Sequence, residues 1–245
     1  MAVGIMVRIR SDKLLSVLGY GTRTEVKKLI ADSALCIDGR TVLRPETKCD
    51  PETERVELCG KRIFFTEYEY WVLNKPSGII TATRDNRHET VIDYMGLTRK
   101  GMSPCGRLDR DTEGLLLITD NGALIHRILS PALHIDKVYE AEGNGTIPEE
   151  AVQMFREGMV LSDGTRCLPA DLSVKKPDTP FSASLTIREG KFHQVKRMFE
   201  SVGCNVTHLR RIAVGPLNLQ DLKLKEGEYR MLTEEEKNKI LELLK

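Results

Sequence analysis

The side chains best suited to chemistry lie in a charged segment between Gly106 and Gly114. Arginines and carboxylates follow one another there, namely Arg107, Asp109, Arg110, Asp111 and Glu113. An ionised carboxylate held at a fixed position can act as a nucleophile or as a general base. The same side chains could also pair with one another in a solvated turn, and the residue types alone leave both interpretations open.

The residues after this segment indicate how it is held. Residues 115–118 are apolar without interruption, and the turn-forming sequence Asp120-Asn121-Gly122 follows them. This pattern predicts a short buried strand. The polar residues 107–113 then form a loop anchored on that strand, which is the usual position of catalytic groups.

Two further stretches carry polar side chains on predicted elements. Residues 136–141 predict a strand that places Lys137 and Tyr139 on one face. Residues 195–202 have the apolar spacing of a helix, which Gly203 ends. A tyrosine in a strand is more often a core residue than a functional one, so these elements by themselves predict scaffold.

Helices and strands intermix without regular β-α-β spacing along residues 67–245. This favours an α+β fold whose larger domain has a mixed, mainly antiparallel sheet flanked by helices. Residues 7–66 predict a smaller, separate α/β domain. Punctuation by Pro51 and Gly60 places the boundary near Thr66.

The smaller domain begins with two short helices and a hairpin. Thr22 and Glu25 have capping-box spacing at the start of the second helix, and Asp38-Gly39 suits the hairpin turn. Basic residues occupy the exposed side of the second helix, and helices with exposed cations beside a hairpin are a compact RNA-binding arrangement. A helical lid that protects the core of the larger domain would fit the same pattern.

The composition is that of a folded chain. Of 245 residues, 40% are hydrophobic and 30% charged, which excludes global disorder. The six cysteines form no Cys-x-x-Cys pair and have no zinc-like spacing to histidine, so we expect a reduced cytoplasmic protein without a structural metal. No stretch has the length of a signal peptide or a membrane span. No Gly-rich phosphate loop or dinucleotide fingerprint is present, so we expect no cofactor.

The net charge of +1 conceals two basic patches. Residues 1–30 carry six basic and two acidic side chains, and residues 188–211 repeat that ratio. Concentrated positive charge on a nearly neutral chain suggests contacts to phosphate, although charge runs are often solvated faces.

Several motifs together resemble the RNA pseudouridine synthases of the small-subunit ribosomal (RsuA) type. They are Leu73-Asn74-Lys75-Pro76-x-Gly78, Gly106-Arg107-Leu108-Asp109 followed by Thr112-Glu113-Gly114-Leu115-Leu116-Leu117, Lys137-x-Tyr139, and Glu189-Gly190 followed by His193-Gln194-Val195-Lys196-Arg197-Met198. The resemblance implies that Asp109 is the essential catalytic residue and that Tyr139 stacks on the target uracil. It also implies a salt bridge from Lys196 to Asp109, with Arg197 as the alternative cation.

The same resemblance suggests lesser roles for other residues. Arg107 would support a phosphate or assist base flipping, while Asp111 and Asp120 would be structural. The His193-Gln194 form of the last motif is similar to the small-subunit branch of the family rather than the large-subunit branch.

Residues 7–65 resemble an S4 RNA-binding domain. The matching segments are Arg10-Ser-Asp-Lys-Leu-Leu-Ser16, Thr22-Arg-Thr-Glu-Val-Lys-Lys-Leu-Ile30 and Cys36-Ile-Asp-Gly39. With the larger domain's motifs, this resemblance leads us to expect RNA contacts from Arg10, Lys13, Arg23, Lys27, Lys28, Arg40, Lys75 and Arg197.

Together the two resemblances imply a monomeric, cofactor-free enzyme that isomerises a specific uridine of small-subunit (16S) ribosomal RNA during ribosome biogenesis. Two alternatives stay open, namely the same chemistry on large-subunit (23S) RNA and a non-catalytic ribosome-assembly factor that binds RNA. Asp109 would either attack C1′ of the ribose or remove a proton from C2′, and the sequence favours neither route.

Overall fold

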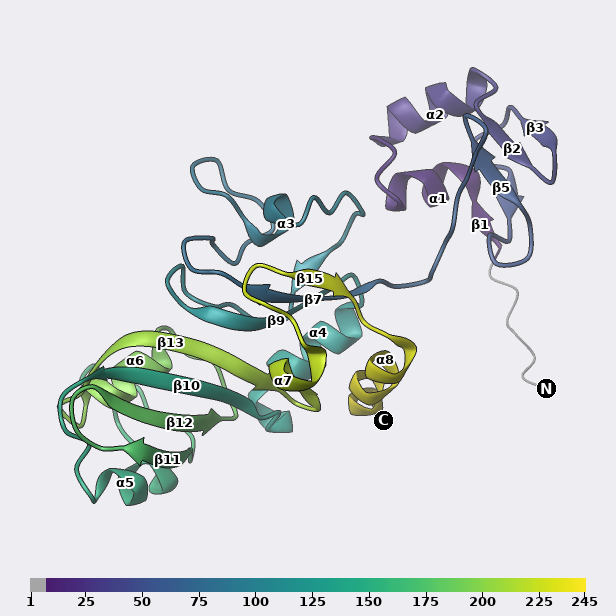
Figure 1. The fold of residues 1–245 in the computed structure, drawn as a ribbon. Helices are drawn as coiled ribbons and strands as arrows, with labels where there is room; N and C mark the ends of the chain where they lie inside the picture. Colours follow the sequence, from purple (N-terminus) through teal and green to yellow (C-terminus); the bar gives the residue numbers. More distant parts are fainter. Residues whose placement is uncertain (1–7) are drawn as a thin grey trace. The chain divides into compact units, whose positions relative to one another are not determined.

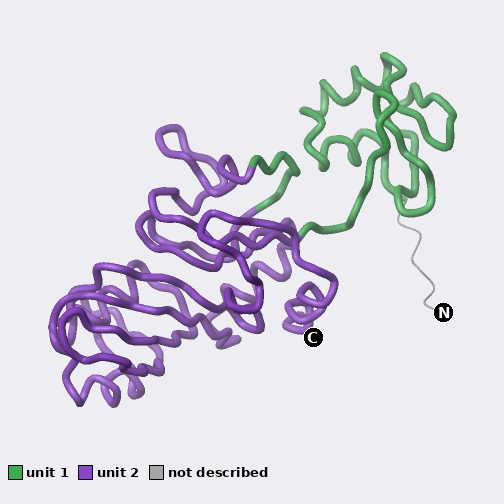
Figure 2. The backbone as a smooth tube through the Cα atoms, in the orientation of Figure 1, with its two compact units in different colours: residues 1–69, 96–102 green, residues 70–95, 103–245 purple. Residues whose placement is uncertain are grey.

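The structure, a computed structural model, describes residues 8–245 and forms two compact units (Figures 1 and 2). The first unit comprises the chain through Glu69 together with Gly96–Met102, and the second comprises Tyr70–Met95 and Ser103–Lys245. In the described residues, no helix has both the length and the apolar character needed to span a membrane.

The segment Gly96–Met102 departs from the sequence prediction, which assigned it to the larger domain. It groups with the first unit because its polar side chains are bonded there. Lys100 Nζ donates to Ser16 Oγ at 2.6 Å and to the Gly21 carbonyl at 2.8 Å. Contacts this distant along the chain leave no local pattern in the sequence.

The first unit packs two helices against a small sheet. The elements are α1 (Ser11–Val17), α2 (Arg23–Ala31), a sheet of order β3-β2-β5-β6 and a separate pair β1-β4, with strands β1 (Ile9–Arg10), β2 (Leu35–Ile37), β3 (Arg40–Val42), β4 (Lys48–Cys49), β5 (Val56–Leu58) and β6 (Lys61–Arg62). The predicted capping box is confirmed, since Thr22 Oγ1 accepts from Glu25 N and the Glu25 carboxylate accepts from Thr22 N. The predicted hairpin is β2 and β3, which pair antiparallel. Leu14, Val26 and Ile30 bury the helices on the sheet.

The second unit is built on one large sheet of order β11-β12-β10-β13-β9-β7-β15, with β14 beside β13 and β8 beside β9. The strands are β7 (Tyr70–Lys75), β8 (Ser103–Pro104), β9 (Glu113–Thr119), β10 (Lys137–Asn144), β11 (Asp171–Lys176), β12 (Phe181–Ile187), β13 (Asn205–Val214), β14 (Leu217–Asn218) and β15 (Tyr229–Met231). Neighbours run antiparallel except β13 and β9, which are parallel. The predicted mixed, mainly antiparallel sheet flanked by helices is confirmed.

Short helices are arranged around this sheet (Figure 1). They are α3 (Val91–Tyr94), α4 (Gly122–Leu129), η1 (Pro131–Leu133), α5 (Ala151–Glu157), α6 (Gln194–Glu200), α7 (Leu219–Leu222), α8 (Glu234–Leu241) and η2 (Glu242–Leu244). Helix α5 contacts β11 and helix α6 contacts β13. Leu124 and Ile128 of α4, Leu115 and Leu117 of β9, and Ile240 of α8 belong to one apolar cluster.

Strand β9 contains the predicted buried strand and holds the charged loop before it. It lies between β7 and β13, and residues 115–118 are almost completely buried. Gly114 has a φ of +105°, and a Cβ atom there would lie 2.2 Å from the Arg211 carbonyl oxygen. Only glycine fits where the loop enters the sheet, so the loop end and β13 are held in close contact.

Candidate active site

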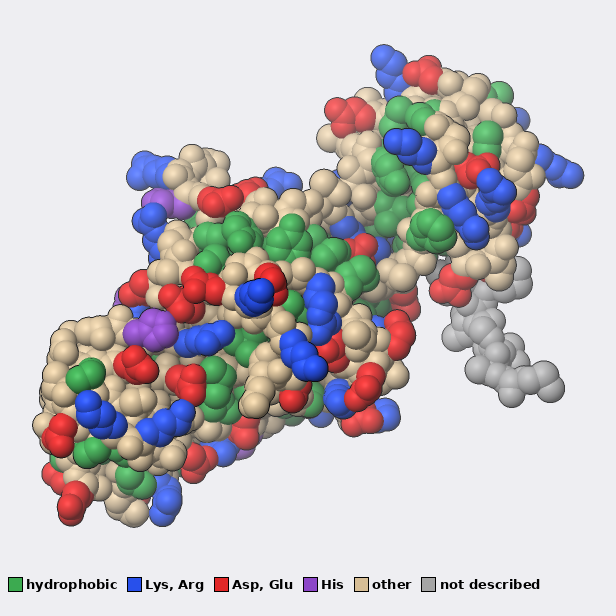
Figure 3. All heavy atoms as spheres, viewed as in Figure 1, with side chains coloured by type: hydrophobic (Ala, Val, Ile, Leu, Met, Phe, Trp, Pro, Cys, Tyr) green, Lys and Arg blue, Asp and Glu red, His purple; other side chains and the backbone are tan. Residues whose placement is uncertain are grey.

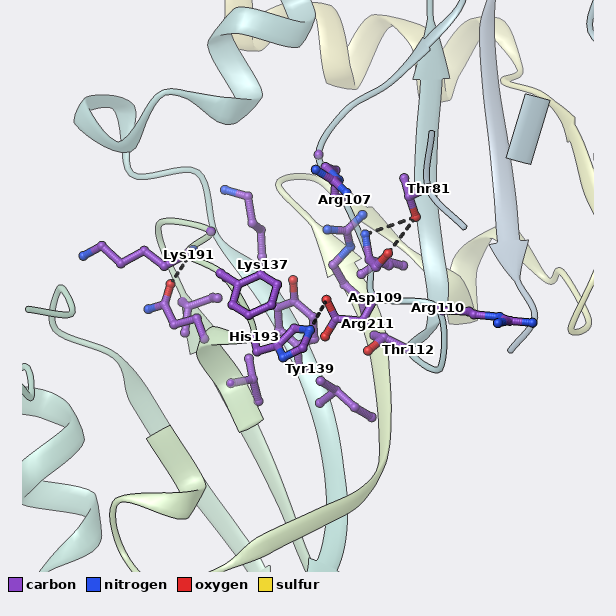
Figure 4. Close-up of a pocket in the computed structure, with 18 of the residues that line it drawn as sticks. Thr81, Arg107, Asp109, Arg110, Thr112, Lys137, Tyr139, Lys191, His193 and Arg211 are labelled. Carbon is purple, nitrogen blue, oxygen red and sulfur yellow. Dashed lines mark hydrogen bonds and ion pairs between the residues drawn. The ribbon is translucent and has the colours of Figure 1, made fainter. Parts of the chain in front are cut away.

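A cavity of about 630 Å³ in the second unit brings three of the predicted site residues together, Arg107, Asp109 and Tyr139 (Figure 4). Asp109 and Arg107 line it from the loop between β8 and β9, and Tyr139 lines it from β10. Residues 190–195, before and within the start of α6, form the opposite wall. Three segments far apart in the sequence therefore meet around one space.

Asp109 sits on a firmly anchored loop. The Leu108 amide donates to Thr81 Oγ1 at 3.2 Å, and Thr81 Oγ1 donates to the Leu108 carbonyl at 2.9 Å (Figure 4). On the other side, the Thr112 amide donates to the Asp109 carbonyl at 3.1 Å. The Asp109 side chain is 29% exposed, so its carboxylate is held at the mouth of the cavity and stays accessible.

Two nitrogen groups flank the Asp109 carboxylate. Lys196 Nζ of α6 lies 3.5 Å from Oδ2, and His193 Nε2 lies 3.5 Å from Oδ1. Lys196 approaches Asp111 more closely, at 2.7 and 2.8 Å to its two carboxylate oxygens. This hydrogen bond from Lys196 lowers the pKa of Asp111. One lysine thus bridges two loop carboxylates, a contact that the sequence did not assign to Asp111.

Arg197, the alternative cation, points to another carboxylate. Its Nη2 lies 2.5 Å from Asp163 Oδ1, and its hydrogen bond lowers the pKa of Asp163. Of the two candidates in this motif, Lys196 is the one beside Asp109.

Tyr139 forms part of the floor of the cavity. It is 7% exposed and pairs across β10 and β13 with Arg211. Lys137 precedes it by two residues on the same face of β10, so Lys137, Tyr139 and Arg211 all line the cavity. Burial lowers the pKa of Lys137 to about 8, and the positive charge of Arg211 adds to that shift.

Lys75 contradicts the prediction that it contacts RNA. Its side chain is completely buried, and Nζ donates to the carbonyls of Pro76, Arg110 and Thr112 at 3.0, 3.2 and 2.9 Å. Burial lowers its pKa to about 8. Strand β7 continues through Lys75. Lys75 ties the charged loop to β7.

The second basic patch, over residues 188–211, is not an open positive surface. Arg188, Lys191, Lys196 and Arg197 each pair with carboxylates, and Arg211 is 1% exposed. On the face drawn in Figure 3, acidic and basic side chains are likewise interspersed. Folding has paired or buried five of the six positive charges that the sequence brings together, and Arg210 is half-buried.

The predicted RNA-binding residues of the first unit lie mostly in solvent. Lys13, Arg23, Lys27, Lys28 and Arg40 are exposed. Arg10 is exposed too, but its Nη2 lies 2.7 Å from Asp12 Oδ2. These side chains are available to a partner, with Arg10 already held by a carboxylate.

Sequence reasoning missed several residues of the cavity. The sequence motif marks His193 only as a sign of the small-subunit branch, yet its ring lies beside Asp109. The backbone of His193 has a φ of 49°. Lys137 shares a face with Tyr139, a periodicity that could have singled it out. Thr81 and Arg211 carry no such signal, because their roles depend on contacts between distant segments. In the described residues, no group of three His, Cys, Asp or Glu side chains could hold a metal ion.

Comparison with known proteins agrees with this geometry. The sequence model of the RNA pseudouridylate synthase family matches residues 69–201. A crystal structure of a pseudouridylate synthase has a TM-score of 0.64 and 33% identity, covering 95% of this chain and 99% of the other. The chain belongs to the RNA pseudouridine synthase family and is an isomerase that converts uridine to pseudouridine in RNA.

Individual relatives cover nearly the whole chain. YtzG, an uncharacterized RNA pseudouridine synthase of Bacillus subtilis, is 42% identical, over 93% of this chain and 96% of the relative. Ribosomal small subunit pseudouridine synthase A of Yersinia pestis is 36% identical over 93% and 96%. Ribosomal large subunit pseudouridine synthase B of Bacillus subtilis is 32% identical over 94% and 95%.

Proposed function

We propose that this chain isomerises a specific uridine of small-subunit (16S) ribosomal RNA, with Asp109 as the catalytic carboxylate. The observation that carries the proposal is the position of Asp109 at the mouth of a cavity that Tyr139 lines, on a loop that Thr81 holds through the Leu108 backbone. A cavity of about 630 Å³ has room for one nucleoside. An accessible carboxylate at its mouth can reach the ribose of a base held inside.

The target uridine leaves its stack to enter the cavity, which costs a few kcal/mol and is offset by contacts inside. The face of Tyr139 packs against the uracil and contributes about 1–3 kcal/mol, as aromatic stacking does for single-stranded RNA. Arg107, exposed at the rim, contacts a backbone phosphate or assists the flipping. Lys196 orients the Asp109 carboxylate through its position 3.5 Å away.

In the reaction, the N1–C1′ bond breaks and its electron pair stays on the uracil. Asp109 either bonds to C1′ as a nucleophile or takes the proton from C2′, and both routes remain open. The uracil then turns and C5 bonds to C1′. At this step the bond between Asp109 and C1′ breaks, or the proton held by Asp109 returns to C2′. The proton on C5 is then lost, and N1 gains a proton. The sum is an isomerisation, so no redox partner or transferred group is required.

We propose that the first unit is an S4-like RNA-binding domain and that the second is the catalytic domain. Exposed cations on α1, α2 and the β2–β3 hairpin support this assignment, because solvated Lys and Arg side chains are free to meet phosphate. A ribosomal RNA substrate also supports cytoplasmic action, and we propose a monomer as the working state.

The small-subunit target is supported by two observations. The relative from Yersinia pestis that acts on the small subunit is 36% identical, against 32% for the large-subunit relative from Bacillus subtilis. The His193-Gln194 form of the α6 motif is also that of the small-subunit branch. The large-subunit similarity makes 23S RNA the second candidate substrate.

The test compares purified enzyme on 16S and 23S RNA, each as naked RNA and as the assembling particle, by tritium release from uridine labelled at C5. We expect release from 16S RNA only. Mapping pseudouridine in both RNAs from a strain lacking the gene identifies the position. Release from 23S RNA alone would transfer the assignment to the large subunit, and release from neither would overturn the assignment to ribosomal RNA.

A further inference from the structure

Two cations on the cavity floor, Lys137 and Arg211, have no role in the reaction described above. Lys137 is 5% exposed and Arg211 is 1% exposed, and both line the cavity (Figure 4). Lys137 lies two residues before Tyr139 on β10, and Arg211 pairs with Tyr139 from the neighbouring strand β13. The floor of the cavity therefore carries concentrated positive charge.

The two cations are bonded to backbone carbonyls rather than to carboxylates. In residues 8–245, neither Lys137 nor Arg211 forms an ion pair with a carboxylate. Lys137 Nζ donates to the Ile135 carbonyl at 3.0 Å, and Arg211 Nε donates to the Leu115 carbonyl at 2.8 Å. Arg211 Nη2 is buried without any hydrogen-bond partner. Buried charges without partners cost free energy, so such groups mark sites where a ligand supplies the partner.

Lys75 serves as an internal comparison for Lys137. Both lysines are buried, and burial lowers the pKa of each to about 8. An ammonium group has three donors. Lys75 Nζ donates to three carbonyls, while Lys137 Nζ donates to one. The ammonium group of Lys75 therefore uses all three of its hydrogen-bond donors within the protein. Lys137, which lines the cavity, uses only one of them.

We propose that Lys137 and Arg211 donate hydrogen bonds to the carbonyl oxygens of the flipped uracil and stabilise its negative charge when the N1–C1′ bond breaks. The inference rests on the proposed function. The electron pair of that bond spreads over N1, O2 and O4 of the ring, and the two cations hold this charge without taking or giving a proton. Fixed donors in a desolvated site act most strongly on charge that develops during a reaction.

The base, rather than a phosphate, is the group that fits this floor. Apolar side chains, among them Leu108, Ile187 and Leu209, line the cavity together with polar ones. A phosphate belongs to the solvated RNA backbone and would lose its hydration there, whereas a neutral uracil enters such a pocket readily. The exposed Arg107 at the rim is the group placed for phosphate.

The decisive experiment varies the leaving group. Fluorine at C5 withdraws electrons and makes uracil a better leaving group, so its departure depends less on stabilising donors. A short RNA that wild-type enzyme converts is prepared with uridine or 5-fluorouridine at the target. Single-turnover rates are measured as loss of the starting nucleoside, by chromatography of the digested RNA, for wild type, Lys137→Met, Lys137→Arg and Arg211→Lys. Lys175→Met, an exposed lysine on β11, is the matched control.

We expect Lys137→Met to lose about 100-fold in rate with uridine, the size of effect seen on removing one donor to developing charge, and about 10-fold with 5-fluorouridine. Lys137→Arg recovers most of the rate, Arg211→Lys shows the same dependence on fluorine, and Lys175→Met matches wild type. Equal losses of Lys137→Met on both substrates would overturn the proposal, as would weaker RNA binding with an unchanged rate, which indicates a phosphate contact.

Two controls separate the possible failures. Thermal unfolding of each variant shows whether it is folded, and if Arg211→Lys is unstable the conclusion rests on the two Lys137 variants. If wild-type enzyme converts no RNA while folded, the proposed function fails. If wild type is active but the fluorine effect on Lys137→Met is absent, only the present inference fails.

Discussion

The cations of helix α2 and those of the cavity differ in what surrounds them. Arg23, Lys27 and Lys28 lie in solvent, whereas Lys137 and Arg211 are 5% and 1% exposed. A solvated cation attracts phosphate at long range, and salt screens its effect. A desolvated cation acts almost unscreened on charge within a few ångströms. On this basis we propose that the first unit supplies affinity for RNA and that the second supplies chemistry.

The largest effect expected to test this separation is that of Asp109→Asn. The variant keeps the shape of the side chain but removes the charge needed for attack or proton removal. We expect pseudouridine formation to fall by at least about 10⁴-fold, as on loss of a central catalytic group. RNA affinity, measured by filter binding, should change less than threefold.

Asp111→Asn is the matched control for Asp109→Asn, because it removes the neighbouring carboxylate that shares Lys196. Its rate should fall by no more than about tenfold, since it only loosens the lysine. Comparable activity of Asp109→Asn and wild type would remove the catalytic assignment, and a large loss of RNA binding would break the division between the units.

Lys196→Met is expected to have the next largest effect. It removes the cation that lies 3.5 Å from Asp109 and bridges to Asp111. We expect kcat to fall about 100-fold with little change in KM. Lys196 orients the Asp109 carboxylate and places a positive charge beside it, and both effects act on the chemical step. Steady-state kinetics with Lys196→Arg as the conservative variant should show substantial rescue, since arginine can bridge two carboxylates.

A different outcome for Lys196 would be informative. A rise in KM with unchanged kcat would make Lys196 an RNA contact, like the exposed cations of α2. Arg197→Met, which breaks the pair with Asp163, should leave kcat within about threefold of wild type because that pair lies away from Asp109.

Lys75→Met should act mainly on stability. Its removal leaves three buried carbonyls without their donor, at about 1–3 kcal/mol for each unsatisfied group, partly offset because a buried charge is also removed. We expect a net loss of about 2 kcal/mol in the free energy of unfolding, measured with urea. The salt dependence of RNA binding should not change.

The pH dependence of Lys75→Met sharpens this prediction. The folded-state pKa of Lys75 is lowered to about 8 from 10.5, so between these values the unfolded chain binds more protons than the folded one. Wild-type stability relative to the variant should therefore rise as pH increases from 8 to 10.5, and be lowest below pH 8. A difference that does not vary with pH would contradict the burial of a charged lysine.

The smallest effect per residue is expected for Lys27→Glu combined with Lys28→Glu. Both side chains are exposed on α2, so their reversal should weaken RNA binding without altering the catalytic step. The slope of log affinity against log salt should fall by about one unit for each lost phosphate contact. Under single-turnover conditions at saturating enzyme, the rate should equal that of wild type.

Lys175→Glu with Lys176→Glu, two lysines on β11, is the control with the same change in net charge. If this control weakens binding as much as the α2 variant, the effect comes from overall charge and not from a site on the first unit. An unchanged slope for the α2 variant would mean that another surface anchors the RNA.

Much of the local structure was predictable because neighbours in the chain decide it. The capping box at Thr22 and Glu25 and the buried strand within β9 both depend on residues a few positions apart. Prediction was wrong where distant segments meet, as at Lys75, which was expected at the surface and is buried among three carbonyls. Lysine is expected at the surface from its residue type alone. Only the packing of distant segments shows that Lys75 is buried.

The sequence by itself determined the family motifs, the order of the elements and the carboxylate that stands at position 109. The tertiary structure decided which cations remain in solvent and which lie beneath the cavity, and it placed His193 and Lys196 beside Asp109. The physical reason is that burial of Lys137 and Arg211 follows from the pairing of β10, β13 and β9. These strands lie far apart along the chain. The local sequence pattern of each strand therefore cannot predict which side chains will line the same cavity.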